Sequence, residues 1–172
     1  MRAFSTIALS ALILASPLMQ STAHAQAAPV CPIGKKDTEL TLQRVMINFG
    51  KFLSPADSVV MDGTMNPSTV TDASLQEGID GLAVSIACAH AVVEMKSEAL
   101  MPAGARKLTG AERDSYNAAF QQAMAQFEQA LVDYASTLQA LIGAPAKDFA
   151  AADAQKKLVN KLADEAHAHF AN

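Results

Sequence analysis

The sequence predicts an all-α protein, with the topology of an antiparallel up-down-up-down four-helix bundle. Four long segments repeat apolar residues every three or four positions, which is typical of amphipathic helices. No segment alternates apolar and polar residues as a half-buried strand does. Hydrophobic residues make up 51% of the 172 positions, enough to supply the core of one domain. Four helices that follow one another in the chain and pack side by side form an up-down-up-down bundle.

The first 25 residues are typical of a secretory signal peptide. Arg2 precedes an apolar run at positions 7–14, and the segment ends in the small residues Ala23 and Ala25. The run is too short to span a membrane. We therefore expect cleavage after Ala25, no membrane insertion of the mature chain, and a periplasmic location. Residues 26–36 then form an N-terminal extension, and residues 37–172 form the bundle.

The charge of the mature chain excludes some classes of partner. Loss of Arg2 leaves 12 Lys and Arg against 17 Asp and Glu, a net charge near −5. An acidic chain lacks the positive surface that attracts nucleic acid or anionic lipid. We expect a soluble monomer that binds neither.

The first predicted helix covers residues 37–53, and five of its apolar residues fall on one face. They are Leu42, Val45, Met46, Phe49 and Leu53. Residues 54–73 are rich in Ser, Pro, Asp and Gly, which predicts a long loop. Such a loop either covers a neighbouring surface or is mobile.

The second predicted helix begins with a capping box between Ser74 and Glu77 and runs to about residue 100, before Pro102. His90 lies at the flank of its core stripe, and Cys88 points to nearly the opposite side. The stripe consists of Leu75, Ile79, Leu82, Ile86, Ala89 and Val93.

Cysteine usage predicts one disulfide. Cys31 and Cys88 are the only cysteines and both remain in the exported chain, where the alternative is two free thiols. The middle of the second helix is apolar on every face, so its outer face needs a cover. A Cys31–Cys88 bond would hold the extension 26–36 against that face. No Cys-x-x-Cys-His motif is present, which excludes covalent c-type haem attachment.

The third predicted helix covers residues 109–142, opens with a capping box between Thr109 and Glu112, and ends before Gly143 and Pro145. Its core stripe consists of Tyr116, Phe120, Ala123, Phe127, Leu131, Tyr134, Leu138 and Leu141. The fourth helix covers residues 148–170. Its inward residues are predicted to be Leu158, Val159, Leu162 and Ala166.

Three histidines remain in the mature chain, and two of them, His167 and His169, lie at the end of the fourth helix. In the predicted topology this end meets the start of the first helix, where Met46 lies roughly 12–15 Å along the axis. A methionine thioether and an imidazole can together hold haem iron without a covalent link. Because both axial positions would be filled, such a site serves electron transfer.

Two motifs support this interpretation: Met46-x-x-Phe49-x-x-x-Leu53 in the first helix and His167-x-x-Phe170 in the last. With the leader and the helix order, they make the mature chain resemble the cytochrome b562 family, soluble periplasmic four-helix bundles that hold one b-type haem. The resemblance implies that Met46 and His167 are the axial ligands of one non-covalent haem b. It also implies that Phe49, Leu53 and Phe170 line the site, and that a redox partner protein exchanges electrons with the haem.

The helical wheel gives a different choice of histidine. Projected from Leu158 and Leu162, His169 falls on the inward stripe, whereas His167 lies about 140° from Leu162. Positions two apart cannot both face inward, so His169 stays the alternative to His167. His90 is held in reserve as a further candidate ligand.

Simpler interpretations stay open. Met46 can be ordinary core packing, and the two terminal histidines can be solvent-exposed residues favoured by the helix dipole, or part of a Zn²⁺ or Cu²⁺ chelate. No nucleophile elbow, phosphate-binding loop or zinc-protease motif is present in the sequence, so we do not expect an enzyme. The alternative to a cytochrome is a haem-free secreted helical bundle that binds a protein or a small apolar ligand.

Overall fold

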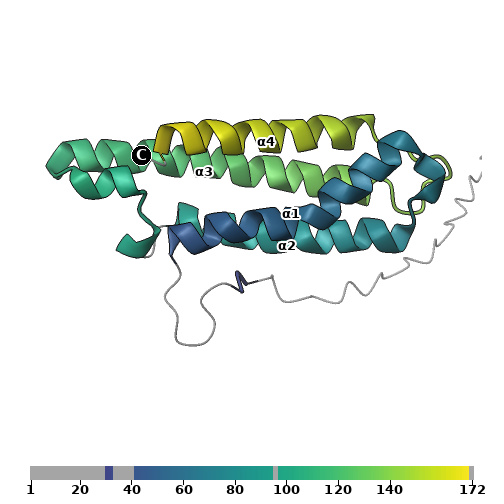
Figure 1. The fold of residues 1–172 in the computed structure, drawn as a ribbon, viewed down its shortest axis with the longest axis horizontal. Helices are drawn as coiled ribbons and strands as arrows, with labels where there is room; N and C mark the ends of the chain where they lie inside the picture. The colour runs from purple at the N-terminus through teal and green to yellow at the C-terminus, as the bar shows by residue number, and fades with distance from the viewer. Residues whose placement is uncertain (1–29, 33–40, 95–96, 171–172) are drawn as a thin grey trace, which may run out of the picture.

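The computed structural model describes residues 30–32, 41–94 and 97–170, and this part of the chain is all-α. It contains four long helices, three short 3₁₀ helices and, within these ranges, no strand (Figure 1). The long helices are α1 (Leu42–Met65), α2 (Asp72–Val93), α3 (Gly110–Gln139) and α4 (Ala150–Phe170). The short ones are η1 (Pro67–Thr69), η2 (Glu98–Leu100) and η3 (Ala103–Lys107). The predicted signal peptide 1–25 and most of the extension 26–36 lie outside the described residues.

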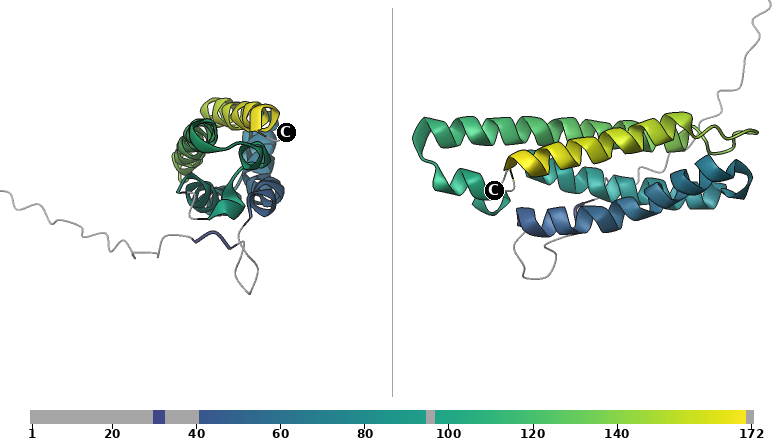
Figure 2. Two further views of the ribbon diagram at one scale, coloured as in Figure 1. Left: turned by 90° about the vertical axis from the view of Figure 1, so that its left-hand side faces the viewer. Right: turned by 45° about the horizontal axis from the view of Figure 1, so that its top comes forward.

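The four long helices lie lengthwise beside one another and enclose one core (Figure 2). Helix α2 packs against α1 and α3, α3 packs against α4, and α1 also contacts α4. The largest fully buried side chains at the centre are Tyr134, Leu75, Leu82, Met124 and Leu131. At one end of the molecule the end of α4 lies close to the start of α1 (Figures 1 and 2).

Helix α1 is longer than the sequence predicts, because it continues through Pro55 to Met65. The prediction of a loop is therefore wrong for residues 54–65. Ala56, Val59 and Val60 are buried in the core, and this packing outweighs the helix-breaking effect of proline. The helix instead changes direction in its second half (Figure 1), as expected where a proline removes one backbone hydrogen bond.

The predicted capping boxes are both wrong in detail. At the start of α2, the Thr71 hydroxyl accepts a hydrogen bond from the Ser74 N–H, and the Ser74 hydroxyl accepts one from the Thr71 N–H, each at 3.1 Å. The capping pair is thus Thr71 and Ser74, three positions earlier than predicted. At the start of α3, Thr109 makes no capping hydrogen bond from its side chain within the described structure. Helix α2 ends at Val93, before the predicted residue 100.

The buried faces of α2 and α4 are also rotated from the predicted stripes. In α4, Leu158 is 40% exposed, whereas Val159 and Phe170 are buried. In α2 the buried positions include Ser85, Cys88 and Val92 as well as Leu75, Leu82 and Ala89, while Ile79, Ile86 and Val93 are only partly buried. Helix α2 packs against two neighbours, so its buried surface is wider than one stripe.

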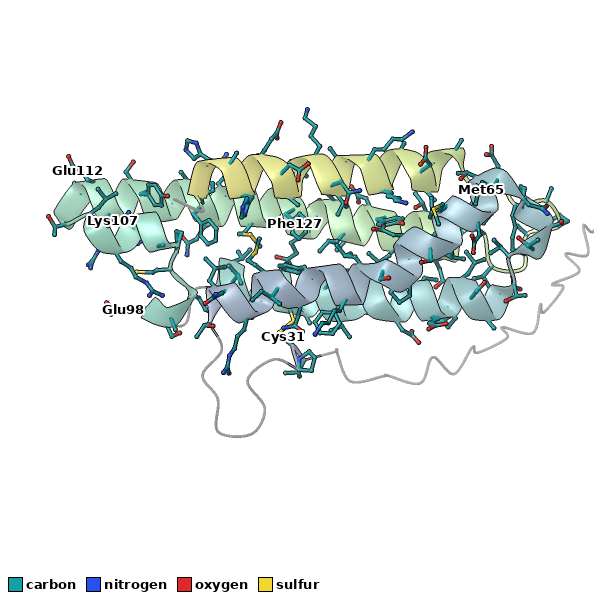
Figure 3. All side chains as sticks on the ribbon, viewed as in Figure 1. Cys31, Met65, Glu98, Lys107, Glu112 and Phe127 are labelled. Atoms are coloured by element: carbon teal, nitrogen blue, oxygen red, sulfur yellow. A yellow bond between two sulfur atoms is a disulfide. The ribbon has the colours of Figure 1, made fainter. Side chains whose placement is uncertain are left out.

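The predicted disulfide between Cys31 and Cys88 is confirmed. The two sulfur atoms are bonded, the two Cα atoms lie 4.6 Å apart, and both residues are buried. Cys31 lies on the side of α1 and α2 that faces away from α4 (Figure 3). The bond therefore fixes residues 30–32 against α2. None of the helices in the described ranges has a stretch long and apolar enough to cross a membrane.

Candidate cofactor cleft between α1 and α4

A cleft of about 600 Å³ opens where the start of α1 meets the end of α4. Helix α1 contributes Met46 and Ile47 to its wall, and α4 contributes His167 and Phe170. Thr41, Leu42 and Gln43 at the start of α1 also line it. The remaining wall comes from the connection between α2 and α3, which carries η2 and η3 and is marked by Glu98 and Lys107 in Figure 3. Three separate parts of the chain thus surround the cleft.

A smaller cavity of about 60 Å³ shares several of these residues. Leu42 and Met46 of α1 and His167 and Phe170 of α4 line both spaces. The small cavity also reaches Met124, which is part of the core on α3. Met46 and His167, which lie near opposite ends of the described chain, are therefore brought to the same place by the fold.

Met46 faces the cleft because its neighbours in α1 face the core. Val45 is fully buried, and Phe49 packs edge-on against Phe127 with ring centroids 5.2 Å apart. Met46 follows Val45 by one position, so it lies at the edge of the core and is only partly buried. Thr41 caps the helix by accepting a hydrogen bond from the Arg44 N–H at 3.3 Å. The start of α1 is thus held in register by packing and by a cap.

The end of α4 is held by Phe170. Its ring packs edge-on against Tyr116 and Phe120 of α3, with centroids 5.4 and 5.1 Å away. His167 is exposed and lies close to one turn before this anchor, on the side that lines the cleft. The anchor holds the last turn of α4, which carries His167, against α3.

His169 lies on a different side of α4 from the cleft. Its ring packs edge-on against Phe170 at 4.7 Å, and it lines a separate hollow together with Gln126 of α3. The wheel turns His169 inward because it is anchored on Leu158, and that residue is exposed. His169 itself is also exposed.

The remaining candidate residues lie away from the cleft. Phe49 and Leu53 are buried core residues and do not line either cavity formed by Met46 and His167. His90 is exposed; its Nδ1 lies 3.1 Å from a Glu128 carboxylate oxygen and its Nε2 lies 3.4 Å from one of Glu94. The reserve histidine therefore pairs with the carboxylates of Glu94, directly after α2, and of Glu128 in α3.

The described residues near the end of α4 do not supply enough ligands for a Zn²⁺ or Cu²⁺ site. Among the residues that the structure describes, no group of three or more His, Cys, Asp or Glu could hold a metal ion. A haem iron needs only two axial ligands from the protein, because the porphyrin supplies the other four. The donor set of Met46 and His167 suits that requirement.

Two arginines that the sequence does not mark lie beside the cleft. A second hollow of about 510 Å³ is lined by Glu98, Arg106 and Arg113, together with Thr41, Ala99 and Met101. Arg106 and three of these other residues, Thr41, Ala99 and Met101, also line the cleft. Helical periodicity in the sequence could not have identified these two arginines as neighbours of the cleft. Arg106 lies in the connection between α2 and α3, and only the three-dimensional path of that connection brings it to the cleft.

Comparison with known proteins gives no matching family model and no significant match among curated proteins or solved structures. The resemblance to cytochrome b562 therefore depends on the two helix motifs, and the interpretation of the cleft depends on its own residues.

Proposed function

We propose that this protein is a periplasmic electron carrier that binds one non-covalent haem b in the cleft between α1 and α4. In this proposal the chain is a monomeric up-down-up-down four-helix bundle, and Met46 and His167 are the two axial ligands. The observation that carries the proposal is that a thioether and an imidazole from different helices line the same two cavities.

The lining of the cleft is compatible with this cofactor. Its volume of about 600 Å³ falls inside the range of small-molecule sites, roughly 300–1,000 Å³. Leu42, Ile47 and Phe170 supply apolar contacts, while Thr41 and Arg106 place polar groups in the wall. When bound, haem supplies reversible one-electron chemistry, and Met/His ligation favours the reduced iron.

The protein's own residues supply position. Val45 and Phe49 hold α1 in the core, so that Met46 lies at the edge of the cleft. Phe170 holds the last turn of α4 against α3, and His167 of that turn lines the same space. Met46 is only partly buried and His167 is exposed, so both side chains are accessible to a ligand.

The test is a visible absorption titration of the mature protein with hemin, followed by reduction with dithionite. We expect sharp reduced α and β bands that saturate at one haem per chain. Met46→Ala and His167→Ala should each abolish the low-spin spectrum. His169→Ala should retain it, as should Met65→Ala, a matched control because Met65 is an exposed methionine at the far end of α1.

Three results would count against the proposal, the first two against a ligand assignment and the third against haem binding. An unchanged spectrum in Met46→Ala removes the thioether as a ligand, and loss of the spectrum in His169→Ala but not His167→Ala assigns the other histidine. A wild-type protein with no haem bands favours the haem-free bundle that binds a protein or an apolar ligand. Export is tested separately, by N-terminal sequencing of periplasmic protein, which should begin at Gln26.

A further inference from the structure

Arg106 and Arg113 converge on the hollow that adjoins the haem cleft. Arg106 lies in η3 and lines both spaces, whereas Arg113 lies near the start of α3 and lines only the hollow. Thr41 and Met101 line both spaces as well. The two spaces are therefore neighbours with a common wall, and Arg106 stands in that wall.

The hydrogen-bonding capacity of these arginines is not used within the described protein. The Nε atom of Arg113 is buried and has no hydrogen-bond partner there. No ion pair joins either arginine to a carboxylate in the described ranges, although Glu98 lines the same hollow. A buried donor without a partner is costly, so the described residues leave the Arg113 guanidinium incompletely satisfied.

We infer that Arg106 and Arg113 form a carboxylate-binding subsite for the ligand that occupies the cleft. A guanidinium group presents a fork of N–H donors that matches a carboxylate in geometry and charge. Two guanidinium groups against the one Glu98 carboxylate leave the hollow positive. With the haem proposed above, the macrocycle would lie in the Met46–His167 cleft and its carboxylate groups would reach into the hollow. This inference rests on the proposed function, because it assigns the anionic edge of the same ligand.

The experiment compares ligands with and without carboxylates. The probes are hemin, metal-free protoporphyrin IX, and the dimethyl ester of each, titrated against wild type and against the double variant Arg106→Gln and Arg113→Gln. We expect the free acids to bind wild type about tenfold more tightly for each arginine that they engage, since a hydrogen bond to a charged group contributes a difference of that size. The esters should bind wild type about as weakly as the acids bind the double variant.

Lys107→Gln is the matched control. Lys107 follows Arg106 in η3, is exposed, and lines neither the cleft nor the hollow, so its loss should change no affinity. Helical circular dichroism of each variant checks the fold. The comparison of acid with ester in wild type needs no substitution, so it tests the subsite even where a variant unfolds.

The results separate this inference from the proposed function. Equal affinities for acids and esters, with low-spin hemin bands in wild type, overturn the subsite and leave the haem proposal standing. Metal-free protoporphyrin IX that binds in an arginine-dependent way, with no low-spin hemin bands, supports the subsite and overturns the axial ligation. Failure of wild type to bind either porphyrin overturns both.

Discussion

Gly81 of α2 faces the backbone carbonyl oxygen of Phe52 in α1 so closely that a Cβ atom at position 81 would overlap that oxygen. Gly78, one turn earlier, approaches α1 in the same way: a Cβ there would lie 3.0 Å from the Ala56 Cα atom. The two glycines thus allow α1 and α2 to pack at short distance, close to Pro55.

We expect Gly81→Ala to lower the free energy of unfolding by about 1–3 kcal/mol, because a backbone carbonyl cannot move aside as a side chain can. The measurement is a urea unfolding midpoint. Gly50→Ala is the matched control: Gly50 is an exposed residue of α1, and a Cβ there would meet nothing within 4 Å. Alanine at position 50 should raise stability by about 0.5–1 kcal/mol through helix propensity. A Gly81→Ala midpoint equal to or above that of wild type would contradict the close approach.

The Cys31–Cys88 bond should stabilise the mature protein. It links residues 57 positions apart, and closing a loop of this length in the unfolded chain is expected to add about 2–4 kcal/mol. A reducing agent should therefore lower the urea midpoint of wild type, but not that of Cys31→Ser, which starts from the lower value. Equal midpoints of wild type with and without reductant would show that the Cys31–Cys88 bond contributes little to stability.

Asp57 should make the stability of the protein depend on pH. Burial raises the pKa of its carboxyl above the usual 3.8, and this effect exceeds the opposing effects of Lys156 and of the Tyr134 hydroxyl, which donates to the carboxylate at 3.3 Å. The folded protein therefore binds this proton more tightly than the unfolded chain does. Its contribution to the free energy of unfolding is full below pH 3.8 and is lost as the pH rises through the folded pKa.

The variant Asp57→Asn isolates this effect. The stability of wild type relative to Asp57→Asn should be highest below pH 3.8 and decline toward neutral pH, as measured by urea unfolding at a series of pH values. Lys156→Met is informative as well. The Lys156 ammonium donates to the Asp57 backbone carbonyl at 3.2 Å and favours the charged carboxylate, so its removal should steepen the decline. A constant difference between wild type and Asp57→Asn would contradict the raised pKa.

Asp72 should act in the opposite direction. The Lys147 side chain, the Gly143 N–H at 3.1 Å and the charge of Lys147 hold the pKa of this carboxyl below its usual value. The stability that it contributes is therefore present above pH 3.8 and is lost as the pH falls through the lowered pKa. Asp72→Asn should remove this acid-sensitive part. Because the Asp72–Lys147 pair is at the surface, high salt should reduce the difference between Asp72→Asn and wild type.

His90 should be dispensable for the proposed cofactor. Its imidazole lies between the carboxylates of Glu94 and Glu128, away from the cleft. His90→Ala should bind hemin with an unchanged spectrum and affinity, in contrast to His167→Ala. A lost or shifted low-spin spectrum in His90→Ala would return this histidine to the set of ligands.

Several features of this protein are determined by the sequence itself. Apolar periodicity is a local property, so the four long helices and the burial of Val45, Phe49, Phe120, Phe127 and Leu138 follow from residue order alone. The disulfide follows as well, since only two cysteines exist and the middle of α2 needs a cover on its outer side. The prediction that Met46 lies near the end of α4 follows from the order of the helices and from the predicted up-down topology.

Other features were decided by the tertiary structure. Pro55 and its polar neighbours predict a loop, yet contacts of Val59 and Val60 with the core keep α1 helical to Met65. The wheel favours His169 because it counts Leu158 as buried, but only the packing of α4 against α3 sets which face is covered, and it turns His167 to the cleft instead. Arg106 and Arg113 line the same hollow because of the path of the α2–α3 connection that carries Arg106. Local preferences amount to fractions of a kcal/mol per residue, whereas burial of a side chain contributes about 1.5–3 kcal/mol, so long-range packing decides wherever the two disagree.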